Sequence, residues 1–137
     1  MVTKVLGILN VTPDSFSDGG NWIDIDTALM RASQMAAQGA DAIDVGGEST
    51  RPGSRAISVQ EELDRILPPL EKLKSEVALP ISIDTRRVEV ARAAVDLGAS
   101  IINDTSALRD DPDLVDLVIS KSLDVVLMHR KGTPVDM

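Results

Sequence analysis

Five apolar runs in the sequence each carry a hydrogen-bonding or ionisable side chain at or near the carboxyl end. These side chains are Asn10, Asp44, Asp84, Asn103 and His129. One polar residue at such a place is common, because Asn and Asp also begin helices. Five in succession are better explained by parallel strands, whose carboxyl ends gather around one ligand. The pattern therefore predicts a polar site at one edge of a parallel sheet.

A long polar loop, residues 9–20, follows the first apolar run and contains Pro13 and a pair of glycines. The only aromatic residues of the chain, Phe16 and Trp22, lie in or beside this loop. A chain that places both of its aromatic rings next to one strand end favours a binding role for the loop. On composition alone, a surface loop with its rings folded over the strand ends is an equal alternative.

The elements that must position these residues are strands that alternate with helices. The apolar runs are Val5–Leu9, Ala42–Val45, Pro80–Ile83, Ser100–Ile102 and Val125–Met128. Near-continuous apolar strands separated by helical segments indicate a parallel sheet covered on both faces.

Four helices are predicted between the strands. Asp24 is a candidate N-cap for the first, and Ser58 begins a capping box for the second. Pro68-Pro69 lies inside the second helix and predicts a kink or break there. Thr85 is a candidate cap for the third helix, and Asp111-Pro112 gives an N-cap and first residue for the fourth.

This order of strands and helices fits either a barrel or an open doubly wound sheet. The first strand is not followed by Gly-x-Gly-x-x-Gly, and no P-loop is present, so the usual nucleotide fingerprints are missing. The long loops after the first two strands fit a barrel better. A complete (β/α)₈ barrel takes roughly 250 residues, whereas this chain has 137.

Composition excludes several classes of function. The net charge of −8 disfavours a nucleic-acid partner, which requires clustered Lys and Arg. The absence of cysteine and the single histidine argue against disulfides and against a multi-histidine metal centre. No apolar run approaches the roughly 18 residues of a membrane span, and no signal peptide is visible. We expect a soluble, cytoplasmic protein with a small-molecule partner and no membrane contact.

Longer motifs identify a family. Gly7–Gly20 resembles the first signature of dihydropteroate synthase, a pterin-binding enzyme of folate synthesis, and Gly39–Gly53 resembles the second. The segments Ile81–Thr85, Ile101–Asp104 and Leu127–Pro134 follow in the order and spacing of the family. The resemblance covers nearly the whole chain, and its first two motifs are long and specific.

The resemblance implies a parallel (β/α)₈ barrel of the TIM-barrel type, of which the chain holds about five strands and four helices. Residues 1–137 would be the N-terminal portion of a single pterin-binding domain. In the family, later strands supply another aspartate, a lysine and an arginine–histidine pair, which have no counterpart here. We therefore expect the chain to be part of a longer protein, with open sheet edges and little or no activity by itself.

The resemblance also implies a reaction: a dihydropterin methyl diphosphate is joined to 4-aminobenzoate, with Mg²⁺ present, to give dihydropteroate and diphosphate. Asn10 would hold Mg²⁺ and the diphosphate. Asp84 and Asn103 would bind the dihydropterin ring, with Met128 lining that pocket. Thr50 would approach the diphosphate, and the aminobenzoate site would be shaped by Phe16, Ser49 and Pro52. The family implies sensitivity to sulfonamides and a homodimer of the full-length protein.

The chemistry of these side chains agrees with that assignment. A pterin edge is rich in donors, which suits the carboxylate of Asp84 and the amide of Asn103. Departure of diphosphate requires cations, and Asn10 is a hard oxygen ligand suited to Mg²⁺. Each residue has a simpler alternative, since Asp84 could serve the next helix start, Asn103-Asp104 could be turn residues, and Met128 could belong to the core.

Two other functions fit parts of the pattern. A pterin-binding methyltransferase that acts on methyltetrahydrofolate with a corrinoid partner shares the barrel and similar acids at strand ends. It would lack the loops Asn10–Gly20 and Gly46–Gly53. A non-catalytic homologue or fragment that acts as a binding module is the alternative from another class.

Overall fold

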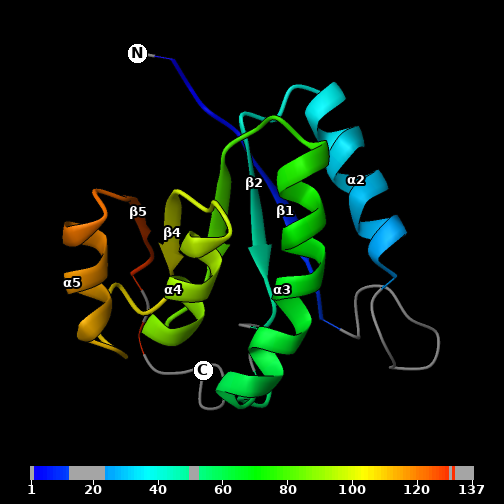
Figure 1. Cartoon of the computed structure of the whole chain (residues 1–137). Coiled ribbons are helices and arrows are strands. Elements are labelled where there is room, and N and C mark those ends of the chain that lie inside the picture. The colour runs from blue at the N-terminus through cyan, green and yellow to red at the C-terminus, as the bar shows by residue number, and fades with distance from the viewer. Residues whose placement is uncertain (1, 13–23, 50–52, 130, 132–137) are drawn as a thin grey trace.

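The computed structural model describes residues 2–12, 24–49, 53–129 and 131. Of the residues singled out above for a site role, Phe16, Trp22, Thr50 and Pro52 lie outside this described part. Strands and helices alternate along the chain (Figure 1).

The strands of the described part form one parallel sheet whose order follows the chain. They are β1 (Leu6–Asn10), β2 (Ala42–Gly46), β3 (Ile81–Asp84), β4 (Ile101–Asp104) and β5 (Asp124–Leu127). The sequential order leaves β1 and β5 at the two edges of this sheet, as expected for the first part of a barrel.

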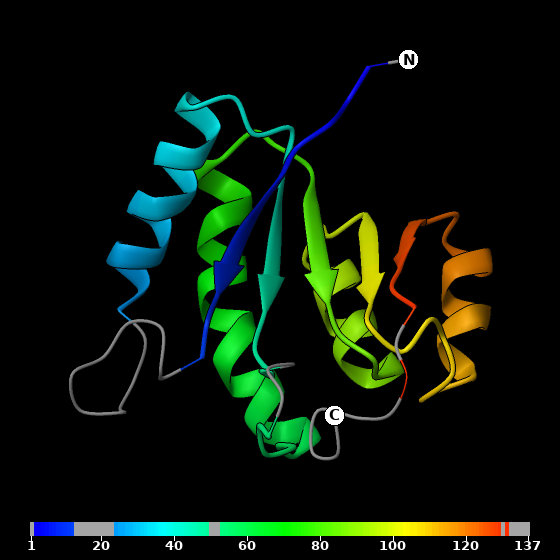
Figure 2. The same ribbon diagram turned by 180° about the vertical axis from the view of Figure 1, so that it is seen from behind.

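The helices of the described part all lie on one face of the sheet, in front of it in Figure 1 and behind it in Figure 2. They are α2 (Ile25–Ala37), α3 (Val59–Glu76), α4 (Val88–Asp96) and α5 (Asp113–Ser120). The prediction of a sheet covered on both faces is thus wrong for this part of the chain. Right-handed crossovers between strands in sequential order place every helix on the same side.

The hydrophobic core fills the space between the sheet and these helices. Alternate residues of each strand point toward the helices, because successive side chains of a strand face opposite sides. The fully buried side chains of this core include Leu9, Ile43, Val45, Ile66, Leu70, Ile83 and Ile102.

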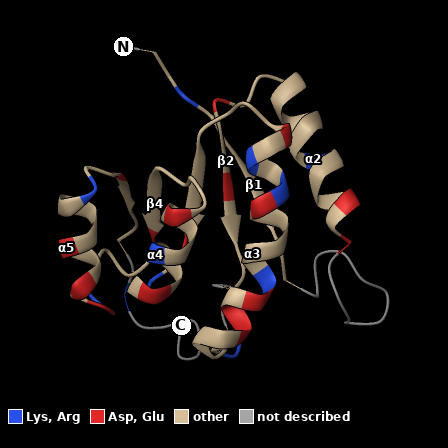
Figure 3. Ribbon diagram, viewed as in Figure 1, with Lys and Arg blue, Asp and Glu red and all other residues tan. Residues whose placement is uncertain are grey.

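The opposite face of the sheet, which we call the open face, carries a mixture of apolar and polar residues. Its exposed apolar side chains include Ile8, which is 65% exposed, and Val126. Its buried polar residues are Asp44 and Ser82, which are in register on neighbouring strands. Figure 3 shows an acidic segment within β2, where Asp44 is the only acidic residue.

Two of the predicted helix starts are confirmed and two are displaced. The side chain of Asp24 accepts a hydrogen bond from Asp26 N, and Ser58 caps α3 in the same way. The prediction that Thr85 caps α4 is wrong, because the N-cap is Arg87. Helix α5 begins one residue later than predicted, with Pro112 at the N-cap.

Helix α3 continues through Pro68 and Pro69, so of the predicted kink or break, the break does not occur. Each proline lacks an amide hydrogen and therefore removes one intrahelical hydrogen bond. The helix is held instead by its packing, since Ile66, Leu70 and Leu73 are fully buried on the same face. Tertiary packing commonly outweighs local propensity in this way.

Candidate functional site

The carboxyl ends of β1–β4 bring three predicted site residues to one level of the sheet. Asn10 is in register with Gly46, Gly46 with Asp84, and Asp84 with Asn103. Residues that are in register on parallel strands point to the same face. The structure thus places Asn10, Asp84 and Asn103 in one row along the open face, although they are far apart in the sequence.

Asp84 is a carboxylate without a counter-ion. Among the described residues, its side chain has no hydrogen-bond or ion-pair partner. Burial, followed by the negative charges of Asp44, Glu62, Asp104 and Glu48, raises the pKa of Asp84 to about 7. Nothing in its surroundings suggests that it serves the start of α4. A half-buried acid held in this way can accept a hydrogen bond or a cation from a ligand.

Gly46 provides the room that Asp84 occupies. A Cβ atom on Gly46 would lie 3.2 Å from both Cβ and Oδ2 of Asp84. The Asp84 side chain therefore lies against the backbone of β2, at the place where a larger residue would push it away. The absence of a side chain at position 46 is part of the site.

Asp44 joins the row from one level below. Its Oδ1 accepts a hydrogen bond of 2.6 Å from Ser82 Oγ, and its Oδ2 accepts one of 3.1 Å from Asn103 Nδ2. Burial raises the pKa of Asp44, while the hydrogen bonds from Ser82 and Asn103 oppose that effect. The Asn103 amide is thus fixed by a side chain from β2, two strands away.

Asn10 lies exposed at the end of β1. Its side chain makes no hydrogen bond to any other described residue, so its amide oxygen is available to a ligand. Within the described part, no group of three or more Asp, Glu or His side chains is arranged to hold a metal ion.

Two further predicted residues border the row. Met128 follows β5, and its backbone N–H donates to Asp104 O at 3.1 Å; its side chain is 38% exposed. Ser49 is half-buried in the segment after β2, and its carbonyl oxygen accepts a hydrogen bond of 2.8 Å from Ser54 Oγ. Met128 is therefore not a fully buried core residue.

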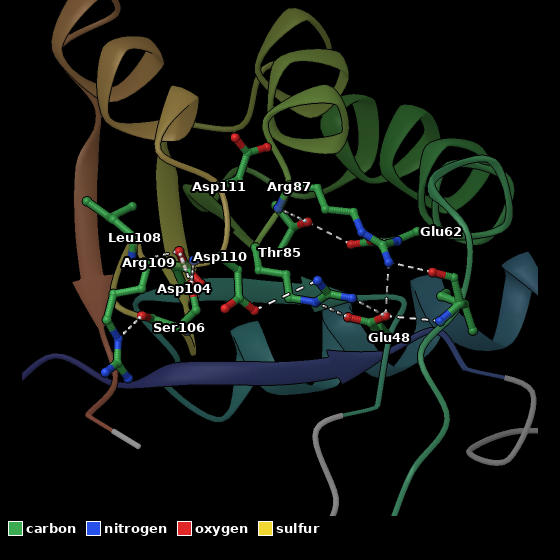
Figure 4. A network of polar contacts seen from close by, with 12 residues as sticks. Glu48, Glu62, Thr85, Arg87, Asp104, Ser106, Leu108, Arg109, Asp110 and Asp111 are labelled. Carbon is green, nitrogen blue, oxygen red and sulfur yellow. Dashed lines mark hydrogen bonds and ion pairs between the residues drawn. The ribbon is translucent and has the colours of Figure 1, made fainter. Parts of the chain in front are cut away.

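A second polar cluster, which we call the rim clamp, lies beyond the ends of β2 and β3 (Figure 4). Glu48 receives two hydrogen bonds from Arg86, at 2.8 and 3.1 Å, and one of 3.1 Å from Ile57 N. Arg87 donates to Ile57 O. Because Glu48 and Ile57 flank residues 49–56, these contacts hold the two ends of that segment together.

The rim clamp continues to helix α3 through Glu62, which is 1% exposed. Its carboxylate accepts hydrogen bonds from Thr85 Oγ1 at 2.7 Å and from Arg87 at 3.1 Å. Thr85 also accepts a hydrogen bond from Arg87 N. The residue expected to cap α4 therefore joins the end of β3 to α3.

Asp104 is occupied by its own turn. Its carboxylate accepts hydrogen bonds from Ser106 N at 2.8 Å, Ser106 Oγ at 3.0 Å and Leu108 N at 2.9 Å. Ala107 and Leu108 have φ values of 54° and 64°, a region that non-glycine residues rarely adopt. The simpler alternative of turn chemistry thus holds for Asp104, whereas Asn103 points into the site.

Sequence reasoning missed the partners that hold the site. Asp44 was noticed as a strand-end residue but received no role, and Ser82 was not considered. Ser82 lies two residues before Asp84 in one strand, so the period of two already placed both on the same face. The rim clamp had no comparable signal, because Glu48, Arg87 and Glu62 meet only through tertiary structure.

Comparison with known proteins gives one consistent family. The sequence profile of the family described as "Pterin binding enzyme" matches residues 6–137. A dihydropteroate synthase of Bacillus subtilis is 48% identical over 129 residues, which are 94% of this chain and 45% of that protein. A probable bifunctional folylpolyglutamate synthase/dihydropteroate synthase of Halobacterium salinarum is 50% identical over 98% of this chain and 16% of its own length.

Solved structures agree with the sequence comparison. A Xanthomonas albilineans dihydropteroate synthase with 4-aminobenzoic acid matches with a TM-score of 0.86 and 51% identity, over 94% of this chain and 47% of that one. A Clostridium difficile dihydropteroate synthase with pteroic acid matches with a TM-score of 0.89 and 46% identity, over 96% and 50%. The predicted parallel α/β fold of barrel type is confirmed, and the chain spans about half the length of these relatives.

Proposed function

The chain belongs to the family of pterin binding enzymes, and from that premise we propose that it forms the first half of a dihydropteroate synthase. The proposed reaction joins a dihydropterin methyl diphosphate to 4-aminobenzoate and releases diphosphate. It is supported by relatives of that name at 44–50% identity over most of this chain. Because the chain spans about half of their length, the activity is proposed for a full-length protein.

The observation that carries the proposal is the unpaired Asp84 beside the fixed amide of Asn103. Asp84 has a raised pKa and no partner among the described residues. Asn103 Oδ1 accepts no hydrogen bond from any described residue, while Asn103 Nδ2 donates to Asp44. Two neighbouring acceptors match an edge with neighbouring N–H donors, such as the amino-pyrimidinone edge of a pterin. Met128 would border the ring on its apolar side.

Asn10 would hold Mg²⁺ and stand next to the diphosphate. When bound, that ion would offset the negative charge that develops on the leaving diphosphate. The side chain of Asn10 is exposed and unengaged among the described residues, which leaves its oxygen available for this role. Thr50, outside the described part, is proposed to approach the same diphosphate.

The aminobenzoate would lie between the two loops that follow β1 and β2. Phe16 and Pro52 belong to those loops outside the described part, and Ser49 lies at the start of the second loop. The rim clamp supports this role, because Glu48 holds the ends of residues 49–56 together. A fixed loop base lowers the entropy that must be lost when the ligand is ordered. Sulfonamides are proposed to compete at this site, as a Yersinia pestis relative has been solved with a sulfonamide complex.

In the proposed reaction the C–O bond to the diphosphate breaks, and diphosphate leaves with the electron pair. The neutral amine of 4-aminobenzoate forms the new C–N bond, and the resulting ammonium loses a proton to solvent. No strong base is required for this step, so positioning of the two substrates supplies much of the rate. The acceptors at Asp84 and Asn103 orient the pterin for that attack.

We place the full-length protein in the cytoplasm as a homodimer, both by analogy with the family. Among the described residues, no helix has the length and apolar character needed to cross a membrane.

The test is formation of dihydropteroate by the full-length protein from the two substrates with Mg²⁺, followed by chromatography. The proposal predicts stoichiometric dihydropteroate and diphosphate, and little or no product from the 137-residue chain alone. Absence of product would contradict the proposal. Methyl transfer from methyltetrahydrofolate to a corrinoid protein would identify the methyltransferase instead, and binding without turnover would identify a non-catalytic homologue.

A further inference from the structure

Asp44 is an ionisable side chain that is almost completely buried without a cation beside it. It is 3% exposed, although it lies on the open face of the sheet, and no ion pair to it occurs in the described part. Burying a carboxylate without a counter-ion costs free energy. The burial of Asp44 is therefore not explained by a gain in stability, whereas its two hydrogen bonds indicate a role in the site.

Those hydrogen bonds come from two different strands and use both carboxylate oxygens. Ser82 Oγ donates to Oδ1 at 2.6 Å from the neighbouring strand β3. Asn103 Nδ2 donates to Oδ2 at 3.1 Å from β4, one level higher on the open face. The carboxylate of Asp44 is thus fixed by Ser82 and reaches past β3 to the amide of Asn103.

The orientation of an asparagine amide depends on its partners. The oxygen and the nitrogen of the amide have nearly the same size, so packing alone does not decide which one points where. An ionised carboxylate only accepts hydrogen bonds and therefore attracts the N–H side. We infer that Asp44 is a positioning residue that holds the Asn103 amide with its oxygen turned toward the ligand.

The orientation of the Asn103 amide makes the site favour ligands that present hydrogen-bond donors. Among the described residues nothing donates to Asn103 Oδ1, and Asp84 in the neighbouring strand position is also without a partner. With the amide held by Asp44, this part of the site offers only acceptors. A ligand that presents adjacent N–H groups can donate to both Asn103 Oδ1 and the Asp84 carboxylate. A ligand edge that carries an acceptor at this position would face two oxygen atoms and be disfavoured. This inference rests on the proposed function, because the pterin is the ligand with such an edge.

A reciprocal exchange tests this role. Asp44→Asn replaces an obligatory acceptor with an amide, so the Asn103 amide loses the partner that orients it. In the double variant Asp44→Asn/Asn103→Asp, the new amide can accept from Ser82 Oγ and donate to the new carboxylate. The second oxygen of that carboxylate then faces the ligand as an acceptor, and the net charge is unchanged. All three hydrogen-bonding groups are again satisfied.

We expect Asp44→Asn in the full-length protein to weaken binding of the dihydropterin substrate by about 10- to 100-fold, as expected for loss of an oriented hydrogen bond. The KM for 4-aminobenzoate should change less than about threefold, and the melting temperature should not fall. The double variant should regain at least about tenfold in pterin affinity. Glu89→Gln, on the exposed surface of α4, is the matched control and should bind as the unchanged protein does.

The inference is contradicted if Asp44→Asn binds the pterin as tightly as the unchanged protein, or if the double variant binds no better than Asp44→Asn. A readout that needs no ligand separates this inference from the proposed function. The side-chain amide signal of Asn103 in a ¹⁵N NMR spectrum, assigned by its loss in Asn103→Asp, should move in Asp44→Asn and stay in Glu89→Gln. Failure of the unchanged protein to bind pterin would contradict the proposed function, while this signal would still decide whether Asp44 holds the amide.

Discussion

Two groups of buried or half-buried carboxylates lie near the carboxyl ends of β2 and β3, and the protein surrounds them with opposite kinds of partner. On the open face, Asp44 and Asp84 have no positively charged partner among the described residues. In the rim clamp, Glu48 pairs with both Arg86 and Arg87, and Glu62 pairs with Arg87. Along the chain, the unpaired Asp44 is followed four residues later by the arginine-paired Glu48. The unpaired Asp84 is likewise followed by Arg86 and Arg87 of the rim clamp.

The pKa values follow this division in the clearest cases. Burial raises the pKa of Asp84 to about 7, and neighbouring negative charges add to the effect. Burial would also raise the pKa of Glu48, but the hydrogen bonds from Arg86 and from Ile57 N and the charges of Arg86 and Arg87 outweigh it and lower the pKa. Glu62 departs from the division, since burial and the charge of Glu48 raise its pKa despite the hydrogen bond from Thr85 and the charge of Arg87.

The difference separates a structural role from a binding role. The carboxylates of the rim clamp are satisfied inside the protein, so their contacts fix a loop base and join β3 to α3. The carboxylate of Asp84 is satisfied by nothing in the described part, so its partner must be a ligand, solvent or a residue outside that part. Unpaired acids of this kind are retained at functional sites at a cost in stability.

The largest effect is expected from Asp84→Asn on catalysis. In the full-length protein, kcat/KM for the dihydropterin substrate should fall by roughly 100-fold or more, because an amide presents a donor where the pterin also presents donors. Steady-state kinetics would measure the change. An unaltered kcat/KM would show that Asp84 does not bind the pterin. It would also contradict the division between carboxylates kept for a ligand and carboxylates paired with arginine.

Arg87→Ala should have a large effect on stability instead. It leaves the buried Glu62 with Thr85 as its remaining partner and frees Ile57 O, so the free energy of unfolding should fall by about 2–4 kcal/mol. Urea denaturation measures this value. Arg92→Ala, exposed on the same helix, is the control and should change stability by less than about 0.5 kcal/mol. Equal effects of the two variants would mean that the rim clamp is not structural.

Asp84→Asn should stabilise the fold above neutral pH. A carboxyl whose pKa is raised in the native state binds its proton more tightly there than in the unfolded chain, so stability falls as pH rises from about 4 to 7. The variant lacks this penalty and should be more stable by about 2–4 kcal/mol at pH 8, with little difference at pH 4. Urea titrations at the two pH values measure it, and a variant that is less stable at pH 8 would contradict the account.

The smallest effect is expected from Gly46→Ala. The new Cβ would lie 3.2 Å from Asp84 and displace its carboxylate by a few tenths of an ångström. Pterin affinity should fall by about 5- to 10-fold, with a stability change below about 1 kcal/mol. Calorimetric titration measures the affinity. Gly53→Ala would not serve as its control, because Gly53 has a positive φ of 80°; Ala93→Gly in α4 tests a small backbone change far from the site.

The sequence predicted the parts of this comparison that depend on local pattern. Strand positions, the caps at Asp24 and Ser58, and the row of Asn10, Asp84 and Asn103 all follow from hydrophobic runs and from residue types at their ends. The break at Pro68-Pro69 was wrong because the packing of α3 outweighs the local preference of proline.

The partners of the site residues could not be predicted in the same way. Asp44 reaches Asn103 across 59 positions of the chain, and Arg86 reaches Glu48 across 38. Such pairs are set by strand register and helix placement, which no local pattern contains. The sequence therefore indicated which acids lie at the strand ends, but not which of them are neutralised by arginine.

The most direct test of this account is a ¹³C NMR titration of the side-chain carboxyl groups of Asp84 and Glu48, without and with a bound pterin. We predict that Asp84 titrates at about 7 in the free protein and moves to lower pH when the pterin donates to it, while Glu48 titrates below its ordinary value in both states. An Asp84 that titrates near its ordinary value of about 4 in the free protein, or that does not respond to pterin, would contradict the claim that this carboxylate is kept for the ligand.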